Sequence, residues 1–201
     1  MLLVTIAHRG EAQEFIKRTF TQPVDFYFQG FYRGREDFLL LTNEGIETSI
    51  LRLSSVLTYF GNKIDRILNM GIAGALVPSL QINQIYGIRN VYHQFHPEID
   101  YPIFSCKETY SKTDAITALR RVTDKKYARS LRKMAQICDR ELWGIALTSN
   151  QFQIPFKSYK LISDYAGENS ELENIKAKSL LYSKHLFDFY TKLSLSKSSW
   201  Q

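Results

Sequence analysis

The residues best suited to chemistry follow three apolar runs of strand length. These segments are His8–Glu11, Gly71–Ala75 and Ser163–Gly167. Open α/β sheets bind ligands beyond the carboxyl ends of their strands, where loops and helix N-termini meet. The sequence therefore predicts that two carboxylates, Glu11 and Asp164, lie with a glycine turn at one edge of a sheet. Paired carboxylates suit general acid–base chemistry.

Each of these residues also has a structural explanation. Glu11 suits the first turn of a helix, where the helix dipole favours a negative charge. Asp164 suits a helix cap or a turn. Gly71 and Gly74 suit a tight passage from a strand to a helix. Taken one at a time, these residues are explained better by structure than by chemistry.

The elements that must position these residues alternate along the chain. Apolar runs of strand length alternate with amphipathic stretches, which predicts an α/β domain with a mostly parallel sheet. The expected strands are Leu2–Ala7, Phe26–Tyr32, Phe38–Thr42, Ile64–Met70, Ile82–Tyr92 and Phe156–Ile162. The expected helices are Glu11–Phe20, Ile46–Phe60, Tyr127–Met134, Asp139–Asn150 and Leu172–Leu193. Residues 93–125 give no clear pattern, and their prolines argue against long elements there.

Length and composition predict one globular domain spanning residues 1–201. An apolar fraction of 44% and a charged fraction of 23% are ordinary for a folded domain. No apolar run is long enough to cross a bilayer, and Met1–Ala7 lacks the basic residues and the length of a secretory leader. Cys106 and Cys138 have neither disulfide nor metal-ligand spacing. We expect a cytoplasmic protein without a metal or cofactor and without a membrane partner.

The net charge of +6 raises the question of nucleic-acid binding. Seven Lys and Arg residues fall between positions 120 and 133, with helix-like spacing from Lys125 to Lys133. A solvated helix face explains this spacing better than a phosphate-binding surface does, and no nucleic-acid motif is present. We expect no nucleic-acid partner, whereas an anionic small substrate or an acidic partner stays compatible with the charge.

Several segments, in order, resemble one enzyme superfamily. They are Ile6–Glu11, Leu41–Ile46, Asn69–Leu76, Gln81–Ile85, Cys138–Glu141 and Pro155–Asp164. Together they resemble the purine nucleosidase/nucleoside phosphorylase superfamily, especially its methylthioadenosine/S-adenosylhomocysteine nucleosidases. The interval from Glu141 to Asp164 agrees with that family without a gap.

The resemblance implies a fold and an activity. The implied fold is a three-layer αβα sandwich with a central mixed, mostly parallel sheet, and the implied assembly is a homodimer. The implied activity is hydrolysis of the N-glycosidic bond of a purine nucleoside or a related nucleoside, which releases base and sugar. The substrate would be a small molecule, and no cofactor is implied.

The resemblance also implies roles for individual residues. Asp164 would protonate the leaving base, which requires a carboxyl with a raised pKa in a partly desolvated pocket. Glu11 would activate the attacking water, and Glu141 would accept hydrogen bonds from the ribose hydroxyls. Carboxylates divided in this way also suit glycosidic chemistry in general. The remaining substrate-binding residues would be Arg140, Gly71, Ile72, Ala73 and Ser163.

Three positions depart from the family pattern. Arg140 replaces a methionine, Ile72 replaces a small hydroxyl residue, and Glu47 replaces a glycine. Arg140 could pair with Glu141 and spoil the ribose contact, or it could face an anionic substituent of an unusual substrate. A catalytically inactive, ligand-binding homologue is therefore an alternative.

The nucleophile is a further open choice. Phosphorylases of the superfamily resemble one another in an arginine two residues before the glycine turn, whereas this chain has Asn69 there. Because Ile72 also lacks a hydroxyl, water is the expected nucleophile. Phosphorolysis is the alternative, because Arg9 or Arg33 could still reach an anion. The segment Gly71–Ala75 also resembles futalosine hydrolases. The base is not identified, because Asp114–Thr117 cannot be aligned with the family's base pocket.

Overall fold

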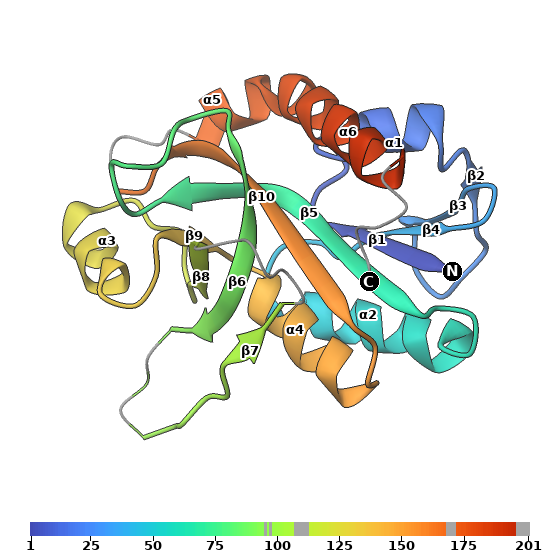
Figure 1. The fold of residues 1–201 in the computed structure, drawn as a ribbon, viewed down its shortest axis with the longest axis horizontal. Coiled ribbons are helices and arrows are strands. Elements are labelled where there is room, and N and C mark those ends of the chain that lie inside the picture. The colour runs from blue at the N-terminus through green and yellow to red at the C-terminus, as the bar shows by residue number, and fades with distance from the viewer. Residues whose placement is uncertain (95, 97, 107–112, 168–171, 196–201) are drawn as a thin grey trace.

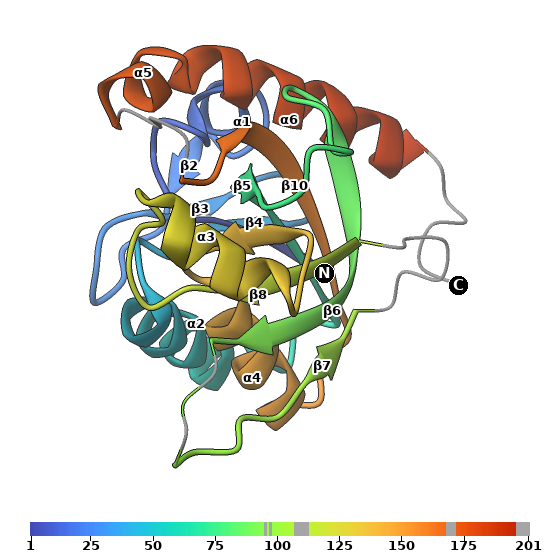
Figure 2. The same cartoon turned by 90° about the vertical axis from the view of Figure 1, so that its left-hand side faces the viewer.

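A central sheet lies between two sets of helices. The structure, a computed structural model, describes residues 1–94, 96, 98–106, 113–167 and 172–195. Helices α1 (Gln13–Arg18) and α6 (Ser179–Leu195) pack together along one face of the sheet (Figure 1). Helices α2 (Ile46–Phe60) and α4 (Leu142–Gln151) pack together on the opposite side. Helix α3 (Lys125–Arg132) lies beyond one end of the sheet, and α5 (Leu172–Ala177) precedes α6 (Figure 2).

The sheet is mixed, and part of it closes on itself. Its strands are β1 (Leu2–Ile6), β2 (Gln22–Pro23), β3 (Phe31–Arg33), β4 (Phe38–Leu41), β5 (Arg66–Ala75), β6 (Ile85–His93), β7 (Phe104–Ser105), β8 (Thr113–Thr117), β9 (Ile137–Asp139) and β10 (Phe156–Tyr165). The order β10-β6-β8-β9-β5 forms a barrel because β10 also pairs with β5. Strands β1, β4, β3 and β2 extend the sheet from β5. Five of the ten described pairings are parallel, so a mixed sheet is confirmed and a mostly parallel one is not.

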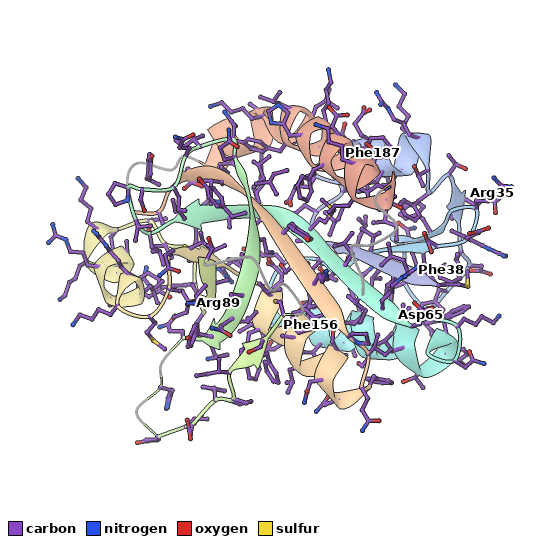
Figure 3. The ribbon with its side chains drawn as sticks, viewed as in Figure 1. Arg35, Phe38, Asp65, Arg89, Phe156 and Phe187 are labelled. Atoms are coloured by element: carbon purple, nitrogen blue, oxygen red, sulfur yellow. The ribbon has the colours of Figure 1, made fainter. Side chains whose placement is uncertain are left out.

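Side chains that alternate along the strands build two cores. Leu3, Phe38 and Leu40 belong to the core shared with α2 and α4, where Phe156 also packs. Their neighbours in sequence, such as Val4 and Leu39, belong to the core beneath α1 and α6. Figure 3 labels Phe156 on the α4 side and Phe187 on α6. This period of two lets both faces of the sheet bury apolar side chains.

Most of the expected elements are present with shifted ends. The runs at residues 2–7, 38–42 and 82–92 are β1, β4 and β6, and the helix at residues 46–60 is α2. The expected strand Phe26–Tyr32 is wrong over most of its length, because the strand is Phe31–Arg33 and pairs antiparallel with β4. Strands β7 and β8 lie in the region that gave no pattern. The single C-terminal helix is wrong too, since α5 and α6 are separate helices on either side of Lys178.

Three corrections concern the predicted site directly. Gly71–Ala75 is not a turn but the second half of β5, where it pairs with β10 and β9. Asp164 likewise lies within β10 rather than after it. Asp139 ends strand β9, so helix α4 begins three residues later than expected. Site residues therefore lie within strands β5 and β10 themselves, where the hydrogen bonds between the two strands fix their positions.

None of the helices described is both long and apolar enough to cross a membrane.

Candidate active site

A cavity of about 620 Å³ gathers the residues predicted from sequence. It lies where β1 and β4 end, along the second halves of β5 and β10, and against α5 and α6. All eight predicted site residues line it: Glu11, Gly71, Ile72, Ala73, Arg140, Glu141, Ser163 and Asp164. Glu11 and Asp164 therefore face one cavity rather than opposite sides of the molecule.

Glu11 lies in the segment between β1 and α1, and a hydrogen bond from strand β5 fixes its side chain. Its carboxylate accepts a hydrogen bond from the backbone N–H of Ile72 at 3.1 Å, and its side chain is buried. Burial raises the pKa of Glu11 because it disfavours the charged form, while His8, the Ile72 N–H and Lys160 act in the opposite direction. A carboxylate with a raised pKa is a better base than an exposed one, which suits activation of a water molecule.

Gly71 makes this position of Glu11 possible. A Cβ atom on residue 71 would lie 3.0 Å from Oε2 of Glu11 and 3.8 Å from Nζ of Lys160. Gly71 does not have a positive φ, so glycine is needed here for space and not for backbone freedom. The glycines of this segment thus serve close approach rather than a turn.

Glu141 lies directly before α4, where it meets the N-terminus of α2. Its Oε1 atom accepts a hydrogen bond from the backbone N–H of Gly45 at 3.0 Å. Gly45 has φ of 99°, a conformation that favours glycine and lets its N–H face the carboxylate. Burial and the nearby charge of Asp139 raise the pKa of Glu141 to about 8, against the lowering effects of Lys160 and the Gly45 N–H. A buried carboxyl of this kind can anchor hydroxyl groups.

Asp164 is partly buried on the outer part of β10. Its Oδ1 atom accepts a hydrogen bond from the Ser163 hydroxyl at 2.5 Å, and that hydroxyl also lies 3.3 Å from the carbonyl oxygen of Ala73. The carbonyl of Ser163 accepts from the Tyr182 hydroxyl of α6 at 3.4 Å. The Ser163 hydroxyl therefore orients the Asp164 carboxyl, while Tyr182 ties this part of β10 to α6.

A buried ion pair in the cavity wall was missed from sequence. The Nζ atom of Lys160 lies 2.9 Å from Oδ2 of Asp139, and both side chains are almost fully buried. Asp139 also accepts hydrogen bonds from the Thr117 hydroxyl at 2.7 Å and from the Leu142 N–H at 2.9 Å. A lysine within the predicted core strand Phe156–Ile162 was the available signal, because a lysine is seldom buried without a partner.

Lys160 places a positive charge among three carboxylates. Burial alone lowers the pKa of Lys160, but attraction to Asp139, Glu141 and Glu11 outweighs burial and raises it. The ammonium group therefore stays charged at neutral pH. The inner cavity combines one cation with three acidic groups, an arrangement that can stabilise positive charge developing on a bound molecule.

Asn69 is engaged entirely within the protein. Its amide group lies 3.2 Å from the Thr5 hydroxyl, to which it donates, and its Oδ1 accepts from the Ser158 hydroxyl at 3.0 Å. By the resemblance, Ile72 is the other position at which phosphorylases carry a phosphate ligand. In this chain it offers an apolar side chain, and its N–H donates to Glu11. These two positions therefore provide neither a cation nor a hydroxyl for phosphate.

The outer part of the cavity is lined by cationic side chains. Nη1 of Arg140 lies 3.6 Å from Oε1 of Glu44, while Glu141 takes its hydrogen bond from Gly45 instead. Besides the buried Lys160, the other cations that line the cavity are Arg9, Arg121 and Lys176. Arg121 thus belongs to the cavity, whereas most of the predicted basic cluster is exposed along α3. Arg33, proposed from sequence as an anion contact, is exposed on β3 and does not line this cavity.

Two further features are Asp114 and the arrangement of potential metal ligands. Asp114 is buried, and it accepts two hydrogen bonds from Arg89 and one from the N–H of Asn90. Asp114 does not line the cavity. In the described part of the chain, no group of three His, Cys, Asp or Glu side chains is placed to hold a metal ion.

No protein-family model matches the chain, and no curated protein matches its sequence. Solved structures do match over almost the whole chain. The 5′-methylthioadenosine/S-adenosylhomocysteine nucleosidase of Helicobacter pylori is 17% identical with a TM-score of 0.81, covering 96% of this chain and 97% of that one. The futalosine hydrolase of Helicobacter pylori strain 26695 is 17% identical with a TM-score of 0.84, covering 96% of each chain. A putative nucleosidase of the first kind from Borrelia burgdorferi B31, solved with adenine bound, is 19% identical with a TM-score of 0.81, covering 97% and 99%.

These similarities confirm the resemblance at the level of the fold. The chain has the fold of the methylthioadenosine/S-adenosylhomocysteine nucleosidases and of futalosine hydrolase.

Proposed function

We propose that this protein is an enzyme that hydrolyses the N-glycosidic bond of a purine nucleoside or a related nucleoside. The observation that carries the proposal is the position of Glu11, Glu141 and Asp164 around one cavity. The shared fold with nucleosidases supports it independently of those residues. Base and free sugar are the expected products.

Asp164 acts as the general acid in this mechanism. It donates a proton to the ring of the leaving base, so that the base departs neutral. The hydrogen bond that the Ser163 hydroxyl donates to Oδ1 orients the carboxyl. The alignment of these groups along paired strands supports a fixed direction for proton transfer.

Glu11 acts as the base, and Glu141 holds the sugar. Glu11 takes a proton from a water molecule that approaches the anomeric carbon on the face opposite the base. Glu141 accepts hydrogen bonds from the ribose hydroxyls, which strengthen as positive charge grows on the sugar.

Water is the proposed nucleophile. Asn69 is engaged with Thr5 and Ser158, and Ile72 offers no hydroxyl, so a phosphate dianion has no evident ligand at these positions. Phosphorolysis is the alternative that these contacts disfavour. An inactive ligand-binding homologue is disfavoured because Arg140 pairs with Glu44 and leaves the Glu141 carboxylate to Gly45.

A base-release assay on the purified protein tests the proposal. Methylthioadenosine, S-adenosylhomocysteine, inosine, adenosine and futalosine should each be incubated with and without phosphate. Release of a free base from at least one of them, lost in Asp164→Asn and retained in Asp25→Asn, would support the mechanism. Asp25 is exposed and outside the cavity, so it is a matched control. No release from any of these nucleosides would argue for the inactive alternative.

We also propose that residues 1–201 form one domain of αβα sandwich type that assembles as a homodimer in the cytoplasm. Exposed large apolar side chains support an interface: Leu51 and Tyr59 lie on α2, and Tyr27 contacts Tyr59. Two buried thiols, Cys106 and Cys138, suit a reducing compartment. A light-scattering mass near 23.4 kDa, that of one chain, would contradict the dimer.

A further inference from the structure

Helix α6 contacts both of the chain segments that carry the proposed acid and base. It lies alongside α1, which follows Glu11, and against β10, which carries Asp164 (Figure 1). The contacts come from two residues near the start of α6, Tyr182 and Ser183, which are adjacent in sequence. Both side chains are buried. One helix therefore connects the two halves of the proposed catalytic pair.

Tyr182 holds the part of β10 that carries Asp164. Its hydroxyl donates a hydrogen bond to the carbonyl oxygen of Ser163 at 3.4 Å, and its ring lines the cavity. Burial, and after it the negative charge of Asp164, raises the pKa of the Tyr182 phenol, so the two groups interact. A donor at this position restricts the backbone of Ser163, and with it the adjoining Asp164.

The other side of α6 holds the segment that carries Glu11. The Ser183 hydroxyl accepts a hydrogen bond from the backbone N–H of Glu14 at 2.9 Å. One turn earlier in α6, Ser179 lies against Gly10, since a Cβ atom on residue 10 would meet the Ser179 Cβ at 3.0 Å. Helix α6 thus contacts this segment both before and after Glu11.

We propose that Tyr182 and Ser183 are positioning residues that set the distance between the general acid Asp164 and the base Glu11. Because they are neighbours in one helix, the two contacts hold the acid and the base in a fixed relation. Catalytic groups act well only within about 0.5 Å and 10–20° of the productive geometry, and a displacement of about 1 Å can slow a reaction about a hundredfold. The inference rests on the proposed function, which gives Asp164 and Glu11 their chemical roles.

Tyr182→Phe tests the contact on the acid side, because it removes only the hydroxyl. We expect kcat for base release to fall about three- to tenfold, the range of one hydrogen bond, with KM and melting temperature close to those of the wild type. Tyr190→Phe is the matched control. Tyr190 lies on the same helix and in the same core but outside the cavity, so kcat should not change.

Ser183→Ala tests the contact on the base side in the same way. It removes the acceptor of the Glu14 N–H, and kcat should again fall with little change in KM. Ser194→Ala is its control, because the Ser194 hydroxyl is exposed and donates within α6, to the carbonyl of Tyr190. A merely structural contact would change melting temperature without this separation of kcat from KM.

Double variants show whether each contact acts through the proposed catalytic group. Tyr182→Phe should slow the reaction much less in the Asp164→Asn background, because no proton transfer from Asp164 is left to align. Ser183→Ala should likewise have little effect in the Glu11→Gln background. Losses that multiply fully in both backgrounds would overturn the proposal.

NMR measures both contacts without turnover. With carbon-13 in the tyrosine rings, Tyr182 should titrate at lower pH in Asp164→Asn than in the wild type, because that variant removes a charge that raises its pKa. The N–H of Glu14 should exchange faster with solvent in Ser183→Ala. No change in either measurement would overturn the proposal.

Failure of the inference and failure of the proposed function give different results. An active wild type with equal kcat in Tyr182→Phe and Tyr190→Phe would overturn the inference and leave the proposed function intact. If the wild type released no base from any of the nucleosides tested, the proposed function would fail, and the positioning role would fail with it.

Discussion

The Nζ atom of Lys160 lies 2.9 Å from the Oδ2 atom of Asp139, and both side chains are nearly inaccessible to solvent. Asp139 has two further donors, Thr117 and the N–H of Leu142, so the anion is fully satisfied. Lys160 is drawn toward Glu11 and Glu141 as well, which keeps it charged despite its burial. The pair therefore fixes both the charge balance of the inner cavity and the positions of β9 and β10 around it.

Lys160→Met should strongly destabilise the protein. Removing one partner of a buried ion pair leaves the other charge uncompensated, at a cost of about 3–5 kcal/mol. Chemical denaturation should show this loss, and the double variant Lys160→Met/Asp139→Asn should recover a large part of it. Lys184→Met is the control, because Lys184 is exposed on α6. A loss no greater than that of the control would mean that the pair contributes nothing.

Glu141→Gln should remove a pH dependence of stability. The pKa of Glu141 in the folded protein is about 8, above its ordinary value of 4.5, because burial disfavours the charged form. The folded state thus keeps a proton that the unfolded state loses. The associated stability is complete below about pH 4.5, falls as the pH rises, and is lost above about pH 8.

Thermal unfolding across this range measures the effect. The melting temperature of the wild type should fall from acidic to mildly alkaline pH, and that of Glu141→Gln should fall less. Glu47→Gln, on the exposed side of α2, should follow the wild type. Parallel curves for the wild type and Glu141→Gln would show that this carboxyl does not titrate in the range.

The sequence predicted the fold where its local pattern was strong. An apolar run marked β1, and helical spacing marked α2. The glycines of Gly71–Ala75 suggested a tight turn from a strand to a helix, but pairing with β10 makes this segment part of β5. Strand β8 escaped detection since its sequence, Thr113–Thr117, includes an aspartate whose partners, Arg89 and the N–H of Asn90, lie on the distant strand β6.

The candidate site was also predictable only in part. Glu11, Glu141 and Asp164 were found through the family resemblance, and all three line the cavity. Lys160 was missed because its partner, Asp139, lies 21 positions away and meets it only across the barrel. Contacts between distant strands decide such roles, and local patterns do not contain them.

Gly71→Ala should impair activity more than stability. The added Cβ atom would meet Oε2 of Glu11 at 3.0 Å, and the end of a glutamate side chain can shift to relieve that contact. The shift would move the proposed base from its hydrogen bond with Ile72. We expect a fall in kcat with a melting temperature close to that of the wild type. A drop in melting temperature with unchanged kcat would contradict this role for Gly71.

Asp164→Asn should slow base release by about 10²–10⁴-fold, because the amide keeps the shape but has no acidic proton to transfer. Substrate affinity should fall much less. Release rates and calorimetric affinities measured on the same preparation separate the two effects. Ser163→Ala is an informative companion, since it removes only the hydrogen bond that orients the carboxyl. Equal loss of rate and affinity in Asp164→Asn would point to a structural role.

The rate of base release should be independent of phosphate. A phosphate dianion entering beside Glu11 would meet Asn69, whose amide is engaged by Thr5 and Ser158, and the apolar side chain of Ile72. The nearest buried cation, Lys160, is already neutralised by Asp139. Removing a dianion from water without new partners is costly, and the surrounding carboxylates add repulsion. Water carries neither cost.

Product analysis is the most direct measurement of this prediction. Hydrolysis yields free ribose, or its substituted form, whereas phosphorolysis yields a sugar 1-phosphate. Base release should have the same kcat/KM at every phosphate concentration, with sulfate as the control for ionic strength. A rate that rises saturably with phosphate would reverse the choice of nucleophile. It would direct attention to Arg9, the cation closest in sequence to Glu11 among those lining the cavity, and would leave the roles of Asp164 and Glu141 intact.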